Sequence, residues 1–301
     1  MKKSDIRLWT LDIGLWLIFG LGSTVYGQNF DLSPMDSLFI RASTGEIKYL
    51  QLNDPARDTL VQMGKKSVPY LIDQLDTKSA RERHTLIAIL KKMKEPAVEP
   101  LINYIQEDPD RGSSRLAAHI LGKIGEEAGV AVPLLIGLIQ HQNWRMRMSA
   151  CEALGEVGDP RAVEPLMTAL KDTVFLVRKG AVFGLGKMED RRSISALIQA
   201  LGDGSYAVRY PASEALETIG RPAVPPLIKA LKENDSITRS LVCGVLGKIQ
   251  DRRALKPLRR MLKDEDWGVK VAAKEALRSL KSKGRIIESP DSPLGQRLET
   301  E

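Results

Sequence analysis

The sequence predicts an all-α protein built as an α-solenoid of about seven helix–turn–helix repeats. One leucine recurs in the expected first helix of each repeat at intervals of 30–34 residues, and another recurs near the end of the second helix at intervals of 30–33. Helix-starting prolines and aspartates and helix-ending glycines follow the same period. A fixed period between about 20 and 50 residues is typical of solenoids and related arrays.

The two sets of leucines are independent of each other, so a common period of about 31 residues is not a coincidence. The first-helix leucines are Leu71, Leu101, Leu135, Leu166, Leu197, Leu227 and Leu258. The second-helix leucines are Leu60, Leu90, Leu121, Leu154, Leu185, Leu216, Leu246 and Leu277.

Local chemistry places the helix ends. Proline in an opening helical turn costs little, because that turn has no partner for the missing N–H. Prolines directly precede the first-helix leucine at Pro100, Pro165, Pro226 and Pro257. Aspartate can cap the free amides of the same turn, and it stands there at Asp159, Asp190 and Asp251. Second helices end in glycine, as at Gly125 and Gly158, where a left-handed conformation terminates a helix.

Residues 159–166 (Asp-Pro-Arg-Ala-Val-Glu-Pro-Leu) and the spaced set Asp172, Val177-Arg178, Ala181 and Leu185-Gly186 resemble the short HEAT repeats of the PBS-lyase HEAT-like (E–Z) type. The resemblance extends over residues 55–281 and implies an ARM-like α-solenoid. Such repeats serve chromophore lyases, scaffolds, a hydroxylase and DNA-repair proteins. The resemblance therefore implies a fold without selecting a function.

The chain divides into four expected segments. Residues 1–27 form a signal peptide, and residues 28–64 keep only the second-helix leucine and form an atypical capping half-repeat. Residues 65–281 form the HEAT-like array. Residues 282–301 contain Gly, Pro, Ser and mixed charges without periodicity, and we expect a flexible tail there.

The amino-terminal segment has the pattern of a secretory signal peptide. Lys2, Lys3 and Arg7 precede an apolar run over residues 13–25, and a small residue, Gly27, follows it. A membrane-spanning helix needs about 20 apolar residues, so an uncleaved membrane anchor is the second choice. We therefore expect export to the periplasm or the cell exterior.

Composition argues against several classes. The formal charge of +7 comes from 45 basic and 38 acidic residues, which is no clustered basic face of the kind that binds nucleic acid. The two cysteines, Cys151 and Cys243, stand three repeats apart. With helix layers about 8–10 Å apart, they lie too far from each other for a disulfide, which needs Cα atoms within about 7 Å.

No catalytic motif is evident. The three histidines, His84, His119 and His141, are not followed by Glu, so the His-Glu pairs by which HEAT-like deoxyhypusine hydroxylases hold two irons are absent. Neither a Gly-x-Ser-x-Gly elbow nor a glycine-rich phosphate loop occurs. We expect a protein that is not an enzyme and holds no metal or cofactor.

A basic residue recurs in the second helix. The column comprises Arg83, Ser114, Arg147, Arg178, Arg209, Arg239 and Lys270. One interpretation is a stripe that binds anions. The favoured one is a structural ladder, in which each Arg fork pairs with the aspartate six residues earlier, such as Asp172, Asp203 or Asp264.

Three residues before the basic position stands an aromatic row, interrupted at Ser236: Trp144, Phe175, Tyr206 and Trp267. The favoured interpretation is that these rings pack each turn against the next repeat. The alternative is that they contact a partner.

Second helices line the concave surface of HEAT-like arrays, and the resemblance therefore implies which residues floor the groove. We expect a binding surface formed by Met148, Glu152, Lys179, Phe183, Tyr210 and Glu214. Apolar anchors in a polar surround are typical of protein-binding surfaces. A nucleic-acid cradle would instead need a uniformly basic lining.

These observations predict an exported, non-catalytic scaffold whose concave face binds a protein or peptide. Two alternatives remain open. One is a tetrapyrrole-lyase-like or other enzyme-associated HEAT protein, which the export signal disfavours because phycobilin lyases act on cytoplasmic antenna proteins. The other is a nucleic-acid-binding HEAT-like protein. Membrane association is expected only if the amino-terminal segment stays uncleaved, and the sequence does not predict an oligomeric state.

Overall fold

The computed structural model describes residues 24–25, 28–29, 34–43, 50–232 and 235–285. Contacts divide the chain into an N-terminal body, residues 1–134, and a C-terminal body, residues 135–301. Most of the expected signal peptide lies outside the described residues. Near its end, β1 (Thr24–Val25) pairs antiparallel with β2 (Gln28–Asn29). Among the described helices, none is long and apolar enough to cross a membrane.

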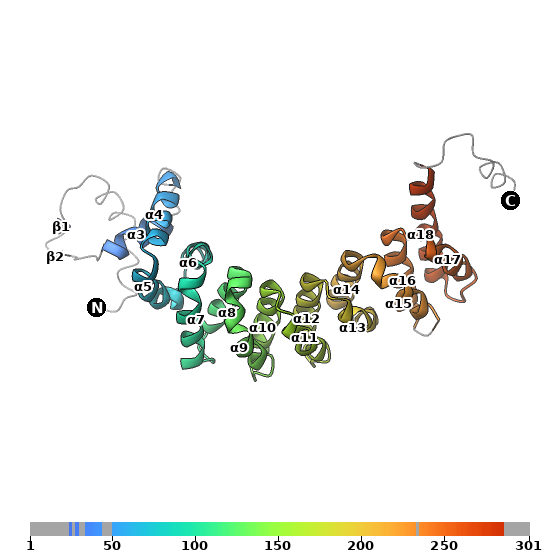
Figure 1. Ribbon diagram of the computed structural model, residues 1–301, viewed down its shortest axis with the longest axis horizontal. Helices are drawn as coiled ribbons and strands as arrows, with labels where there is room; N and C mark the ends of the chain where they lie inside the picture. The colour runs from blue at the N-terminus through green and yellow to red at the C-terminus, as the bar shows by residue number, and fades with distance from the viewer. Residues whose placement is uncertain (1–23, 26–27, 30–33, 44–49, 233–234, 286–301) are drawn as a thin grey trace. The chain divides into compact units, whose positions relative to one another are not determined.

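The described residues of the N-terminal body from residue 34 onward are mainly helical (Figure 1). Its α-helices are α3 (Pro34–Ser43), α4 (Leu50–Gln62), α5 (Val68–Asp73), α6 (Ala80–Met93), α7 (Glu95–Glu107) and α8 (Ser114–Ile124). Short 3-10 helices connect them: η3 (Gly64–Lys66), η4 (Gln74–Asp76) and η5 (Gly125–Ala131). Helix α9 (Val132–Leu138) crosses the boundary between the two bodies.

The segment expected to be half a repeat contains two helices, α3 and α4, which pack on each other. Arg57 Nε donates a hydrogen bond to the Ala42 carbonyl at 3.1 Å. The Phe39 ring meets Tyr70 of α5 edge-on, with centroids 6.0 Å apart. This helix pair therefore covers the apolar side of the repeat that follows it.

The C-terminal body repeats one hairpin. The longer second helices are α10 (Trp144–Val157), α12 (Phe175–Met188), α14 (Tyr206–Ile219), α16 (Ser236–Ile249) and α18 (Trp267–Arg285). The first helices are α11 (Val163–Ala169), α13 (Ile194–Ala200), α15 (Val224–Ala230) and α17 (Leu255–Met261). A 3-10 turn opens each first helix: η6 (Pro160–Ala162), η7 (Arg191–Ser193), η8 (Arg221–Ala223) and η9 (Arg252–Ala254). Helix α18 continues four residues past the expected end of the array at residue 281.

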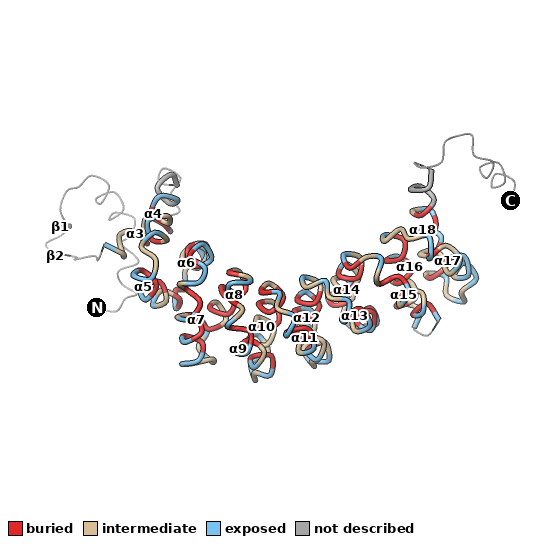
Figure 2. Tube along the Cα trace, in the orientation of Figure 1, coloured by how far each residue is buried: buried red, intermediate tan, exposed pale blue. Residues whose placement is uncertain are grey.

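In this body the second helices stand along one side and the first helices along the other (Figure 1). The buried residues lie where the two rows of helices face each other (Figure 2). All of the periodic leucines are buried, and most are fully inaccessible. Burying each leucine side chain contributes about 2–3 kcal/mol, so the predicted period is the period of the core.

The predicted aspartate caps are confirmed. Asp159, Asp190 and Asp251 each accept a hydrogen bond from the backbone N–H two residues later, at 2.8–2.9 Å. They cap the 3-10 turns that lead into the first helices. The prediction for Pro100 is wrong, because α7 begins at Glu95 and includes this proline in its interior.

Two pairs of second helices approach each other closely at glycine residues. A Cβ atom added to Gly155 of α10 would lie 2.2 Å from the Cα atom of Gly184 of α12. Similarly, a Cβ atom on Gly247 of α16 would lie 2.7 Å from the Cα atom of Ala276 of α18. The glycines that follow the second-helix leucines therefore set how closely neighbouring repeats pack, a role beyond helix termination.

Residues with the left-handed helical conformation end α10, α12 and α16. The prediction is wrong for Gly125, which ends α8 with a positive φ of 85° but a ψ of −141°. Gly158 ends α10 with φ 75°, as predicted, but Glu189 stands at the same place in α12 with φ 51°. A left-handed conformation costs a residue with a Cβ atom roughly 1–2 kcal/mol. The Glu189 side chain is exposed, so replacing it with glycine would remove part of this strain without loss of buried contacts.

We therefore expect Glu189→Gly to stabilise the protein by up to about 1 kcal/mol and Gly158→Ala to destabilise it by about the same amount. Urea unfolding followed by circular dichroism measures both changes. If both substitutions lower the midpoint, the left-handed geometry does not limit stability at these helix ends.

Candidate protein-binding surface

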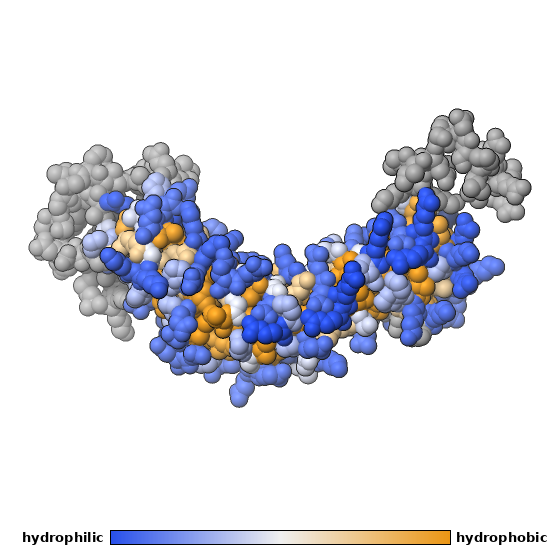
Figure 3. Space-filling model, viewed as in Figure 1, coloured by the Kyte–Doolittle hydropathy of each residue, from blue (hydrophilic) through white to orange (hydrophobic). Residues whose placement is uncertain are grey.

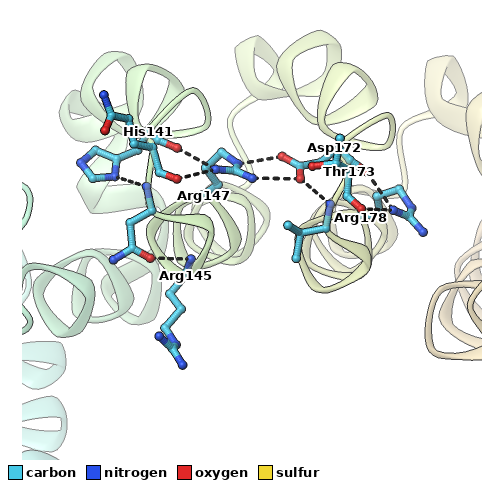
Figure 4. Close-up of polar contacts among 9 residues, drawn as sticks. His141, Arg145, Arg147, Asp172, Thr173 and Arg178 are labelled. Carbon is cyan, nitrogen blue, oxygen red and sulfur yellow. Dashed lines mark hydrogen bonds and ion pairs between the residues drawn. The ribbon is translucent and has the colours of Figure 1, made fainter.

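The basic column forms a ladder of bidentate ion pairs on the turns of the C-terminal body. Arg147 donates from Nε and Nη2 to the two carboxylate oxygens of Asp172, at 2.7 and 3.0 Å (Figure 4). Its Nη1 donates to the carbonyls of His141 and Gln142, at 2.8 and 2.9 Å. One guanidinium thus ties the start of its own helix to two turns.

The same pairing recurs twice. Arg178 binds Asp203 at 2.6 and 2.9 Å, and Arg239 binds Asp264 at 2.9 and 2.8 Å. The sequence interpretation is right that a ladder exists but wrong about the carboxylate. Each Arg pairs with the Asp that follows it by 25 residues, in the next repeat. From the residue six positions earlier, Arg147 and Arg178 take the backbone carbonyl instead.

Arg209 interrupts the ladder. Its Nη1 donates to the carbonyls of Asp203 and Gly204, at 2.8 and 3.3 Å. The residue 25 positions later is Asn234, which carries no charge and lies outside the described residues. The guanidinium carbon of Arg209 instead lies 5.9 Å from the centroid of the Tyr206 ring.

An open cavity of about 440 Å³ lies beside the first rung, lined partly by His141, Arg147, Thr168, Lys171 and Asp172. Arg147 uses four hydrogen bonds within the rung, out of five N–H donors in a guanidinium. The Arg147 guanidinium is therefore already bound by groups of the protein. We interpret the cavity as a consequence of the ladder and not as a ligand site.

The aspartates of the ladder have a lowered pKa. Burial alone would raise the pKa of Asp203, but hydrogen bonds from Arg178 and from the Ser205 N–H, together with the positive charge of Arg178, outweigh burial and lower the pKa. The hydrogen bond with Asp203 raises the pKa of Arg178. The ionised pair therefore stabilises the folded state at neutral pH.

We expect acid to weaken the ladder. A carboxyl with a lowered folded-state pKa contributes stability above its ordinary value of 3.8 and loses that contribution as pH falls through the lowered value. Asp203→Asn should cost about 1–3 kcal/mol at pH 7, because it leaves the mostly buried Arg178 without its charge partner. The difference from wild type should shrink as the pH falls below about 4, when the wild-type pair is also lost.

Urea midpoints measured between pH 7 and pH 3 test this expectation. Glu99→Gln, which removes an exposed carboxylate of α7, is the control and should change the midpoint little at any pH. A constant difference between Asp203→Asn and wild type across this range would contradict the assigned role of the carboxylate.

The two predicted binding sets lie on the same face of the second helices. Within each helix the aromatic residue, the first groove residue and the second groove residue are four positions apart, and residues four apart share a helix face. We name this surface the second-helix face. It comprises Trp144, Met148 and Glu152 of α10, Phe175, Lys179 and Phe183 of α12, Tyr206, Tyr210 and Glu214 of α14, and Trp267 of α18.

Most aromatic rings on this face are exposed. Relative exposure is 42% for Phe175, 37% for Phe183, 64% for Tyr206, 47% for Tyr210 and 76% for Trp267. The favoured interpretation of the row as turn packing is therefore wrong for Phe175, Tyr206 and Trp267. Trp144 alone of the row is half-buried.

Side chains of the second-helix face contact one another and the neighbouring helices. The rings of Tyr206 and Tyr210 lie 5.9 Å apart between centroids. A hydrogen bond with Glu214 and the negative charge of that residue raise the pKa of Tyr210. Met148 and Glu152 are half-buried, and a Cβ atom on Gly180 of α12 would lie only 3.2 Å from Met148 Cγ, so Met148 contributes to helix packing as well as to the surface.

One further exposed residue, Lys187, extends the surface. Lys187 follows Phe183 by one more helical turn, and its Nζ lies 5.6 Å from the centroid of the Phe183 ring. Ile237 is also half exposed, but it follows Ser236, the row position of α16, by one residue and therefore lies off this face. The spacing of four could have identified Lys187 from the sequence, whereas the exposure of Ile237 depends on how α16 packs.

On the side of the molecule drawn in Figure 3, hydrophobic and hydrophilic residues are interspersed. Within the described part of the chain, no group of three or more His, Cys, Asp and Glu side chains could hold a metal ion. Cys151 and Cys243 are buried and unpaired, as expected. Burial raises the pKa of each thiol to about 12, so neither supplies a thiolate nucleophile at neutral pH.

Comparison with known proteins finds a family and no curated relative. The sequence profile of HEAT repeats matches residues 98–181, 168–241 and 224–291. A search of curated proteins finds no match.

Several solved structures are similar to this chain at low identity and with TM-scores below 0.5. An engineered protein is 17% identical over 82% of this chain and 84% of its own, with a TM-score of 0.47. Human deoxyhypusine hydroxylase in complex with glycerol is 21% identical over 82% and 96%, with a TM-score of 0.35. The complex of CpcE and CpcF of phycocyanin lyase from a Nostoc species is 22% identical over 70% and 93%, with a TM-score of 0.42.

Proposed function

This protein belongs to the HEAT-repeat family, and on that premise we propose that its second-helix face binds another protein or a peptide without catalysing a reaction. The observation that carries the proposal is the exposure of Phe183, Tyr206 and Tyr210 on neighbouring helices. Solenoids use such extended surfaces for binding, and buried aromatic anchors dominate the energetics of protein interfaces.

The side chains of the face support a binding role better than a chemical one. The aromatic rings offer apolar area, and Lys179 and Glu214 beside them are exposed. The buried aspartates of the body serve the ladder and the helix caps. A rigid array with apolar anchors and a polar rim is suited to a non-catalytic scaffold.

We expect Phe183→Asp combined with Tyr210→Asp to weaken partner binding more than about 100-fold, because each change removes an anchor and buries a charge at the interface. The partner is first captured by a photo-reactive phenylalanine analogue at position 183 and identified by mass spectrometry. Binding of the purified partner to the variant is then measured by surface plasmon resonance.

The matched control is Val130→Asp with Leu262→Asp, which changes two exposed apolar residues outside the second-helix face. It should bind the partner as wild type does. Circular dichroism verifies that both double variants stay helical. Equal binding by the two double variants would place the binding surface elsewhere.

We further propose that the protein is exported. The support is the sequence pattern of Lys2, Lys3 and Arg7 before the apolar run of residues 13–25, which is typical of a signal peptide. An exported scaffold would meet its partner in the envelope or outside the cell.

Fractionation of cells that express the chain with a carboxy-terminal tag tests export. We expect a product shortened by about 27 residues in the exported fraction, as cleavage of a signal peptide requires. Full-length protein in the membrane fraction would indicate an uncleaved anchor. Full-length protein in the cytoplasm would contradict export and restore the lyase-like and nucleic-acid-binding alternatives.

A further inference from the structure

Four exposed side chains form a single stripe along α12. Phe175, Lys179, Phe183 and Lys187 are each one helical turn apart, so they lie in line on the second-helix face. All four are exposed. The two phenylalanines are eight residues apart, which places their Cα atoms about 12 Å from each other along the helix axis.

The cations of this stripe are not neutralised by the protein. Among the described residues, neither Lys179 nor Lys187 forms an ion pair. The ammonium group of Lys187 lies over the Phe183 ring at 5.6 Å from its centroid, which keeps the charge beside the aromatic anchor.

The neighbouring carboxylates are already engaged. On α14, Glu214 forms a hydrogen bond with Tyr210, and Glu217 forms an ion pair with Lys248 of α16 at 2.9 Å. On α10, Glu152 and Glu156 are half-buried and have interactions of their own. Neither Lys179 nor Lys187 is paired with any of these carboxylates, so the charge that the α12 stripe itself offers to a partner is positive.

We infer that the α12 stripe binds an acidic peptide segment of a partner, with two large apolar side chains seated on Phe175 and Phe183 and carboxylates on Lys179 and Lys187. This inference rests on the proposed function and specifies the partner's chemistry. The apolar contacts supply most of the affinity, and the complementary charges select the partner and accelerate its association.

Aromatic rings and cations also bind single-stranded nucleic acid, by stacking bases and attracting phosphates. The surroundings of the stripe favour the peptide. Glu152 on one side and Glu214 on the other would repel a continuous phosphate backbone, whereas a short peptide can place its carboxylates at the two lysines alone.

The test selects ligands by their chemistry. A display library of random peptides about 16 residues long, enough to span ~24 Å as a helix, is panned on the immobilised full chain. The expected selected peptides carry an excess of Asp and Glu and at least two aromatic or large aliphatic residues. Their binding should weaken about 10-fold or more, and lose most of its salt dependence, in the variant Lys179→Glu with Lys187→Glu.

The matched control is Lys229→Glu with Lys256→Glu, which makes the same charge change on the first helices α15 and α17, where both lysines are exposed. It should retain the affinity of wild type. Circular dichroism verifies folding of both variants, whose changes affect exposed side chains only.

Two results would overturn the inference. One is selection of neutral or basic peptides whose binding still depends on Phe183 and Tyr210, which would leave the proposed function standing. The other is tighter binding of a random single-stranded DNA pool than of any selected peptide, with the same dependence on Lys179 and Lys187. Peptide binding that ignores Phe183, Tyr210 and both lysines would contradict the proposed function as well.

Discussion

The bidentate bond between an arginine of one repeat and an aspartate of the next is the constraint on which the C-terminal body depends. Arg178 fixes the start of α12 to its own turn through the Asp172 and Thr173 carbonyls and to the next turn through Asp203. Only 18% of the Arg178 side chain and 11% of the Asp203 side chain are exposed, so losing either partner leaves an uncompensated charge in a largely buried place. Where a rung is present it fixes the turn edge of the hairpin, and the glycine contacts of α10 with α12 and of α16 with α18 fix the spacing of those helices.

Between α14 and α16 the sequence provides neither the aspartate of an Arg–Asp rung nor the glycine of a close helix contact. The carboxylate position of the rung is Asn234, and Glu217 stands where Gly155, Gly186 and Gly247 stand in the other second helices. A side chain at this place prevents the close backbone approach seen between α10 and α12. The ion pair of Glu217 with Lys248 spans the junction instead, and an exposed pair of this kind contributes only about 0–1 kcal/mol. Helix α14, with its exposed tyrosines, thus borders the least constrained junction of the body.

The fold was predictable because its signals are local and repeat. The leucine spacing recurs in every repeat of the array, and aspartate caps and terminal glycines recur in several of them, so a misleading signal in one repeat is outweighed by the others. The carboxylate partners of the arginines were not predictable, because the Asp that precedes Arg178 and the Asp that follows it are equally periodic. Likewise, the exposure of Phe175 and Tyr206 depends on how each helix start packs against its neighbours, which periodicity does not encode. Three of four aromatic residues were therefore assigned to packing that the structure does not show.

Because the ladder, the caps and the core use other positions of the hairpins, residues of the second-helix face can vary without disturbing these contacts. There the residues change from helix to helix: Glu152 and Glu156 on α10, Lys179 and Lys187 on α12, and Glu214 on α14. A ligand displaced by one repeat would bring its carboxylates against Glu152 or Glu214 instead of the lysines, and like charges in contact are unfavourable. The uniform scaffold can therefore hold a partner in one register, since the charge of the face distinguishes α12 from the helices on either side.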